Sequence, residues 1–134
     1  MDQNDRRGTY LHEATTRRVI GAFYDVYQEL RGGSLEGVYR NALSIRLGEL
    51  GIAAEAETTL EVFFHDQRVG WFRADVLVEA RVLVELKALP TLTKDHERQL
   101  INYLKASRIE VALLLNFGPT PQIRRFVNTP TRKA

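Results

Sequence analysis

Two short apolar segments carry three charged residues whose types and spacing suit chemistry at a phosphate. Asp75 lies in the segment 72–78, and Glu85 and Lys87 lie in 82–88, where the neighbouring residues are mostly those of a buried strand. Burying a charge costs free energy unless the charge is paired. Two carboxylates and an amine in such segments are therefore candidates for a functional site.

The alternation of side chains along a strand predicts how these residues meet. Glu85 and Lys87 share one face of a strand, and Leu86 points to the other. If residues 79–81 form a three-residue hairpin loop, Asp75 falls opposite Glu85. The same register places six apolar residues on one face: Ala74, Val76, Val78, Val82, Val84 and Leu86. A two-residue loop would mix charges into that face, so the three-residue loop is favoured.

This arrangement suits hydrolysis of a phosphodiester. Carboxylate oxygens of Asp75 and Glu85, with the backbone carbonyl of Leu86, are ligands that fit Mg²⁺ or Mn²⁺. An ion held there would bind a scissile phosphate oxygen and acidify a water. Lys87 would orient that water or neutralise charge on the phosphorane. A structural ion pair is the alternative, because Glu-x-Lys is a short and common string.

Composition is that of one soluble globular domain. The chain has 134 residues, of which 44% are hydrophobic and 27% charged, enough for a single core. It has no cysteine, no apolar run of membrane-spanning length and no apolar leader at the N-terminus. We therefore expect a cytoplasmic protein that does not bind membranes. Most basic residues are arginine, which suits phosphate contacts, although scattered solvated arginines are the simpler explanation of the excess.

Hydrophobic periodicity predicts the elements that position the three residues. Helices are expected at 11–30, 35–50 and 94–106, and strands at 55–64, 69–78, 82–88 and 111–117, with a short last strand at 122–127. Ser34 and Thr93 are the predicted N-caps of the second and third helices, and Gly51 ends the second. Leu35 and Val38 are predicted on the inner face of the second helix. The domain is expected to cover 11–127, with loose ends at 1–10 and 128–134.

The order α-α-β-β-β-α-β describes an α+β protein whose mixed sheet is flanked by helices. It resembles the restriction-endonuclease-like core, in which the second and third strands carry the metal site. The sequence also resembles the PD-(D/E)xK nuclease superfamily, and within it the small bacterial GxxExxY family. Five motifs carry this resemblance in order: 33–39, 72–75, 84–88, 99–104 and 115–118. The resemblance implies a nuclease-like site with a divalent ion.

The resemblance also implies supporting roles for Glu36 and Gln99. Glu36 falls in the first turn of the second helix, where related nucleases supply a third acidic group; simple complementarity to the helix dipole is the alternative. Gln99 lies on the third helix, where a polar residue often holds the attacking water or a phosphate in the superfamily. A solvated helix position explains Gln99 equally well. Tyr39 and Tyr103 are interpreted as packing residues.

The predicted function is that of a metal-dependent phosphodiesterase, a nuclease acting on nucleic acid, with DNA favoured over RNA. The first alternative is a nuclease-like module that binds nucleic acid or a partner protein with little turnover. The second is an enzyme that uses the same ion site on sugar or nucleotide phosphates. Because the domain is minimal, a homodimer or a partner protein would supply specificity.

Overall fold

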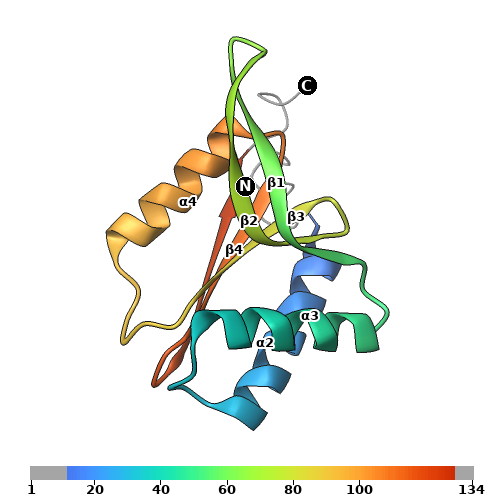
Figure 1. Cartoon of the computed structure of the whole chain (residues 1–134), viewed down its shortest axis with the longest axis vertical. Helices are drawn as coiled ribbons and strands as arrows, with labels where there is room; N and C mark the ends of the chain where they lie inside the picture. The colour runs from blue at the N-terminus through green and yellow to red at the C-terminus, as the bar shows by residue number, and fades with distance from the viewer. Residues whose placement is uncertain (1–11, 129–134) are drawn as a thin grey trace, which may run out of the picture.

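Three helices and five strands make up the part of the computed structural model that is described, residues 12–128. The elements are α2 (Glu13–Leu30), α3 (Glu36–Glu49), β1 (Ala54–Phe64), β2 (Gln67–Val78), β3 (Val82–Lys87), α4 (Lys94–Ala106), β4 (Val111–Phe117) and β5 (Pro121–Val127). Helices α2 and α3 lie on one side of the sheet and α4 on the other (Figure 1). This is the α+β, restriction-endonuclease-like arrangement that the sequence predicts.

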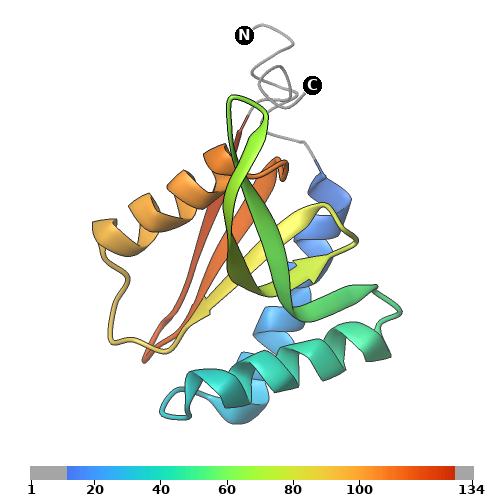
Figure 2. The ribbon, with the colours of Figure 1, turned by 45° about the horizontal axis from the view of Figure 1, so that its top comes forward.

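The strands follow one another across the sheet in the order β1-β2-β3-β4-β5. All neighbours are antiparallel except β3 and β4, which are parallel and are joined by the crossover through α4. The β1–β2 hairpin is longer than the others and projects past the rest of the sheet (Figure 2). The loose ends predicted at 1–10 and 128–134 lie outside the described residues, apart from Asn128, whose N–H donates to Glu110 O at 2.8 Å.

Two hydrophobic cores form because both faces of the central strands are covered. Val82, Val84 and Leu86 of β3 pack towards α2 and α3, whereas Leu83 packs towards α4. Every residue of β4 is buried, as expected for a strand with helices on both sides. The third helix begins at Lys94 as predicted.

The predicted hairpin register is confirmed, but the prediction that Ala74 shares the apolar face with the other five residues is wrong. Residues 79–81 form the loop, and Val76 pairs with Val84. Ala74, however, packs with the α4 core, whereas Val76 packs with the α2–α3 core. The change of face coincides with Glu57, which lies across from this part of β2 and has a positive φ of 55°.

Two details of α3 correct the sequence prediction. The helix begins at Glu36 after Leu35, and Ser34 is not its N-cap. Leu35 and Val38 are exposed rather than inward-facing, because the buried stripe consists of Tyr39, Leu43 and Leu47. A residue one position before that stripe is turned about 100° away from it. Gly51 does end the helix as predicted: its φ is 74°, and Ile52 N donates to Leu47 O at 2.9 Å.

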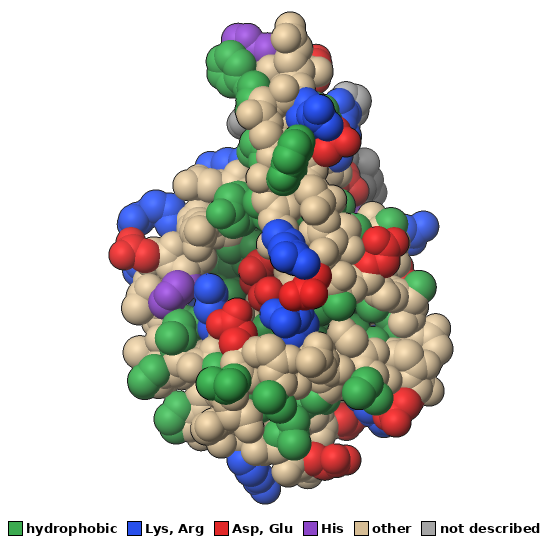
Figure 3. All heavy atoms as spheres, viewed as in Figure 1, with side chains coloured by type: hydrophobic (Ala, Val, Ile, Leu, Met, Phe, Trp, Pro, Cys, Tyr) green, Lys and Arg blue, Asp and Glu red, His purple; other side chains and the backbone are tan. Residues whose placement is uncertain are grey.

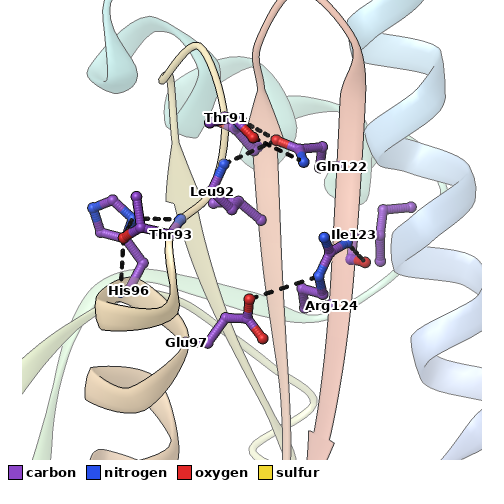
Figure 4. Close-up of polar contacts among 9 residues, drawn as sticks. Thr91, Leu92, Thr93, His96, Glu97, Gln122, Ile123 and Arg124 are labelled. Carbon is purple, nitrogen blue, oxygen red and sulfur yellow. Dashed lines mark hydrogen bonds and ion pairs between the residues drawn. The ribbon is translucent and has the colours of Figure 1, made fainter.

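Polar contacts fix the segment that leads from β3 into α4 (Figure 4). The side chain of Thr93, the predicted N-cap, accepts from His96 N at 3.4 Å, and His96 Nδ1 accepts from Thr93 N at 3.2 Å. Gln122 Oε1 on β5 accepts from Leu92 N at 3.0 Å. The start of α4 is thus anchored to the sheet. No helix within the described range is long and apolar enough to cross a membrane.

Candidate active site

Asp75 and Glu85 meet where β2 and β3 separate. The last ladder pair between these strands is Val76 with Val84, and beyond it side chains make the contacts between the strands. Asp75 Oδ2 accepts a hydrogen bond from Leu86 N at 2.8 Å, and Glu85 Oε1 accepts one from Asp75 N at 3.3 Å. Each carboxylate is therefore held by the opposite strand. Two acidic side chains end up as direct neighbours, as the register predicts.

Leu86 sets the direction of its neighbours on β3. Its side chain is fully buried in the core beneath α2 and α3. Because side chains alternate along a strand, Glu85 and Lys87 leave β3 on the opposite side. The prediction that the Leu86 side chain lies in the core is confirmed.

The carboxylate pair is electrostatically strained. Burial and, after it, the neighbouring charge of Asp75 raise the pKa of Glu85 to about 8, whereas Lys87 opposes the rise. Asp75 itself retains only 17% of its side-chain exposure. At neutral pH Glu85 therefore keeps its proton unless a cation takes the place of that proton.

Glu36, the first residue of α3, belongs to the same electrostatic group. Burial raises its pKa; the charge of Lys87 lowers it, that of Asp75 raises it, and that of Arg40 lowers it. These interactions place the Glu36 carboxylate within reach of the charges on β2 and β3. The structure thus brings Glu36 near enough to Asp75 and Lys87 for their charges to act on it.

Tyr39 holds the loop that precedes Glu36, a role that sequence reasoning missed. Its hydroxyl donates to Arg31 O at 2.5 Å and accepts from Ser34 N at 3.0 Å. Its ring is buried and stacks on Phe117 at 4.1 Å, with 10° between the planes. The fixed spacing of Tyr39 three residues after Glu36 was the available signal. A packing role alone does not account for the hydroxyl contacts.

Arg40 is a second residue that the sequence did not single out. Its Nη1 lies 3.9 Å from Asp75 Oδ1, and its Nη2 lies 3.2 Å from Glu57 Oε1. Glu57 in turn pairs with Arg73 at 3.6 Å. Figure 3 shows acidic and basic side chains gathered at the centre of this face, between the hairpin and α3. Arg40 can offer a guanidinium to an anion bound beside Asp75.

Gln99 is not brought into this group. It is exposed on α4, and its Nε2 donates to Tyr103 Oη at 3.1 Å. Tyr103 stacks on Phe72 at 4.1 Å, which makes it a packing residue as predicted. Within residues 12–128, no hydrogen bond or ion pair joins Gln99 to the acidic residues. A role for Gln99 in chemistry stays a prediction.

The carboxylates of the site are ligands of the type that a hard divalent ion prefers, but they are few in number. Among the residues from 12 to 128, no three His, Asp or Glu side chains are grouped closely enough to hold a metal ion. Asp75 and Glu85 remain as adjacent carboxylates, and a buried acidic pair with a displaceable proton is a suitable donor set for Mg²⁺ or Mn²⁺. Mg²⁺ commonly binds through one or two carboxylates and keeps several waters. The two acids are therefore sufficient in type and number.

Comparison with known proteins agrees with this site. A family model of the PD-(D/E)XK nuclease superfamily matches residues 13–126. The chain belongs to this superfamily. Nucleases of the PD-(D/E)XK superfamily generally use divalent metal ions.

A structural neighbour shares the PD-(D/E)XK domain's fold. The crystal structure of SSO0001 superposes with a TM-score of 0.55 at 19% sequence identity, covering 94% of this chain. The chain spans only 63% of the length of that protein, so the likeness concerns the fold alone. No curated protein sequence matches the chain.

Proposed function

We propose that this domain is a metal-dependent phosphodiesterase that cleaves nucleic acid, with DNA as the favoured substrate. We also propose that it belongs to the GxxExxY group of the superfamily. One observation supports the proposal above others: the carboxylates of Asp75 and Glu85 meet across two strands, with Lys87 two residues further along. A buried acidic pair beside a lysine is costly for folding, and a cation together with a phosphate would relieve that cost.

Each side chain of the proposed site has a separate role in hydrolysis. A divalent ion, Mg²⁺ or Mn²⁺, would be held by Asp75, Glu85 and the Leu86 carbonyl and would supply Lewis-acid chemistry at a phosphate oxygen. Lys87 Nζ orients the attacking water or stabilises the negative charge that develops on the phosphate oxygens. Glu36, whose pKa is raised by burial, is a stronger base than an exposed carboxylate and is suited to accept a proton from that water. Gln99 would contact water or phosphate from α4.

Cleavage assays with three variants test this mechanism. Single- and double-stranded DNA and RNA are incubated with the protein in Mg²⁺, in Mn²⁺ and in EDTA. Lys87→Ala should lower the rate on the order of 10²–10³-fold, because it removes an electrostatic stabiliser. Asp75→Ala should lose both metal binding and activity. Lys105→Ala, on the exposed side of α4, is the matched lysine control and should cleave as wild type. Cleavage in EDTA, or at the wild-type rate in Lys87→Ala, contradicts the mechanism.

A module that binds nucleic acid without turnover is the second candidate. One observation favours it: within the described range no three acidic or histidine side chains are grouped to hold an ion, and Arg40 approaches Asp75 to 3.9 Å. In that case the acidic pair is neutralised by Arg40 and the Glu85 proton rather than by an ion. Wild-type protein that binds oligonucleotides but cleaves none of the four substrates in either metal would establish this reading.

A further inference from the structure

The β1–β2 hairpin carries an exposed aromatic surface that the proposed chemistry does not use. Trp71 on β2 is 63% exposed, and Val69 and Phe64 near the hairpin tip are also exposed. The tip of the hairpin projects past the rest of the described domain (Figure 2). Large exposed apolar side chains grouped on one projection are typical of an interaction surface.

Arginines flank this tryptophan. The Arg68 guanidinium lies over the Trp71 ring, 5.3 Å from its centroid. A shift in register at Val62 and Phe63 adds one residue to β2, which brings Arg68 and Trp71 together although they are three positions apart. The guanidinium holds the ring in place, and much of the ring stays open to solvent. Glu61, paired with Trp71 in the ladder, is the acidic neighbour of this surface.

A line of charged residues joins Trp71 to the acidic pair. Trp71 and Arg73 are two residues apart on β2 and therefore share one face of the strand, and Asp75 follows two residues later, about 13 Å from Trp71 at ~3.3 Å per residue. Ion pairs continue along the same line: Arg73 to Glu57, Glu57 to Arg40, and Arg40 to Asp75. Figure 3 shows these kinds of side chain side by side below the hairpin. The sugar-phosphate backbone of a nucleic acid can follow this line to the acidic pair.

We propose that Arg68, Trp71 and Arg73 form a hairpin surface that binds an unpaired stretch of a nucleic-acid strand and leads it to Asp75. The inference rests on the proposed function and specifies its substrate class as nucleic acid with unpaired bases. In a duplex the bases stack on one another, so only an unpaired base can stack on Trp71. The arginines on both sides match the phosphates of such a strand, which favours nucleic acid over a second copy of this chain.

Trp71 is the only tryptophan of the chain, so its fluorescence reports this surface alone. Wild-type protein is titrated in EDTA, where no cleavage is expected, with a dye-labelled single-stranded oligonucleotide or a blunt duplex. Dye anisotropy measures binding, and tryptophan emission measures base stacking. The single strand should quench the emission in a saturable way with the same midpoint as the anisotropy. The blunt duplex should quench little.

Three variants sharpen the test. Trp71→Ala should weaken single-strand binding on the order of tenfold or more, and Trp71→Phe should retain most of the affinity, because a ring still stacks. Arg73→Ala should lower the salt dependence of binding by about one phosphate contact. Ile45→Ala removes an equally exposed apolar side chain on α3 and should bind as wild type. Circular dichroism of each variant checks that the fold is intact.

The outcomes separate this inference from the proposed hydrolysis. Quenching together with weaker binding of Trp71→Ala supports the hairpin surface, whether or not any cleavage is found. Binding with unchanged tryptophan emission and unchanged Trp71→Ala affinity overturns it, while Lys87-dependent cleavage would leave the proposed function standing. Equal quenching by the blunt duplex overturns the preference for unpaired bases. An emission change that depends on protein concentration alone would identify a self-association surface and also overturn the inference.

Discussion

Replacing Glu85 with glutamine should remove a pH-dependent cost of folding. The ordinary pKa of the side chain is 4.5, whereas burial beside Asp75 raises the native value to about 8. Between these two values the native state binds more protons than the unfolded state. The free energy of unfolding must therefore fall as pH rises through this window: the cost is absent below about pH 4.5, where both states are protonated, and complete above about pH 8, where both are ionised.

The size of the effect follows from the shift. One pKa unit corresponds to about 1.4 kcal/mol, so a shift from 4.5 to about 8 sets an upper limit of roughly 5 kcal/mol. Water penetration and relaxation around the pair reduce that limit. We expect wild type to lose on the order of 3 kcal/mol relative to Glu85→Gln between pH 5 and pH 8.

Urea denaturation in EDTA, repeated from pH 5 to pH 8.5, measures this difference. Wild type is compared with Glu85→Gln and with Glu29→Gln, an exposed position on α2 that controls for the loss of one acidic group. At pH 8, Mn²⁺ should restore stability to wild type more than to Glu85→Gln, because a bound cation stabilises the charged pair. If the wild-type and Glu85→Gln curves run parallel across this window, Glu85 does not titrate as a buried, coupled acid and the reasoning fails.

Three further variants test the support around the site. Lys87→Ala should retain nucleic-acid binding while losing cleavage, which anisotropy and a cleavage assay distinguish. Tyr39→Phe should cost about 1–3 kcal/mol and lower kcat more than affinity, because Arg31 O and Ser34 N lose their partner in the loop before Glu36. Gly118→Ala should destabilise the fold strongly, since an added Cβ would lie 2.4 Å from Leu89 O, whereas Gly48→Ala meets nothing within 4 Å and should be neutral or stabilising in thermal unfolding.

The elements were predictable wherever one local signal dominated. Apolar runs bounded by turn residues placed β4 at its observed ends, and Thr93 marked the start of α4 through its capping contacts. The β2–β3 register followed from period-two alternation, because a slip by one residue would have buried charges. The start of α3 was less predictable. Ser34 is a good cap by type, but its N–H is bonded to Tyr39 Oη, a contact made by the tertiary arrangement of the loop.

Assembly of the site depends on tertiary contacts between distant segments, which the local sequence pattern of one segment does not predict. Asp75 and Glu85 stand out because charge in an apolar strand is expensive. Arg40 and Glu57 lie in ordinary amphipathic surroundings, and only the packing of α3 beside the distorted part of β1 brings them to Asp75. Ala74 belongs to the α4 core although Val76 belongs to the other, and Arg73 pairs with Glu57. The ion pairs from Arg73 through Glu57 and Arg40 to Asp75 connect the projecting hairpin to the carboxylates, which is why we place the proposed binding surface and the proposed chemistry on the same strand.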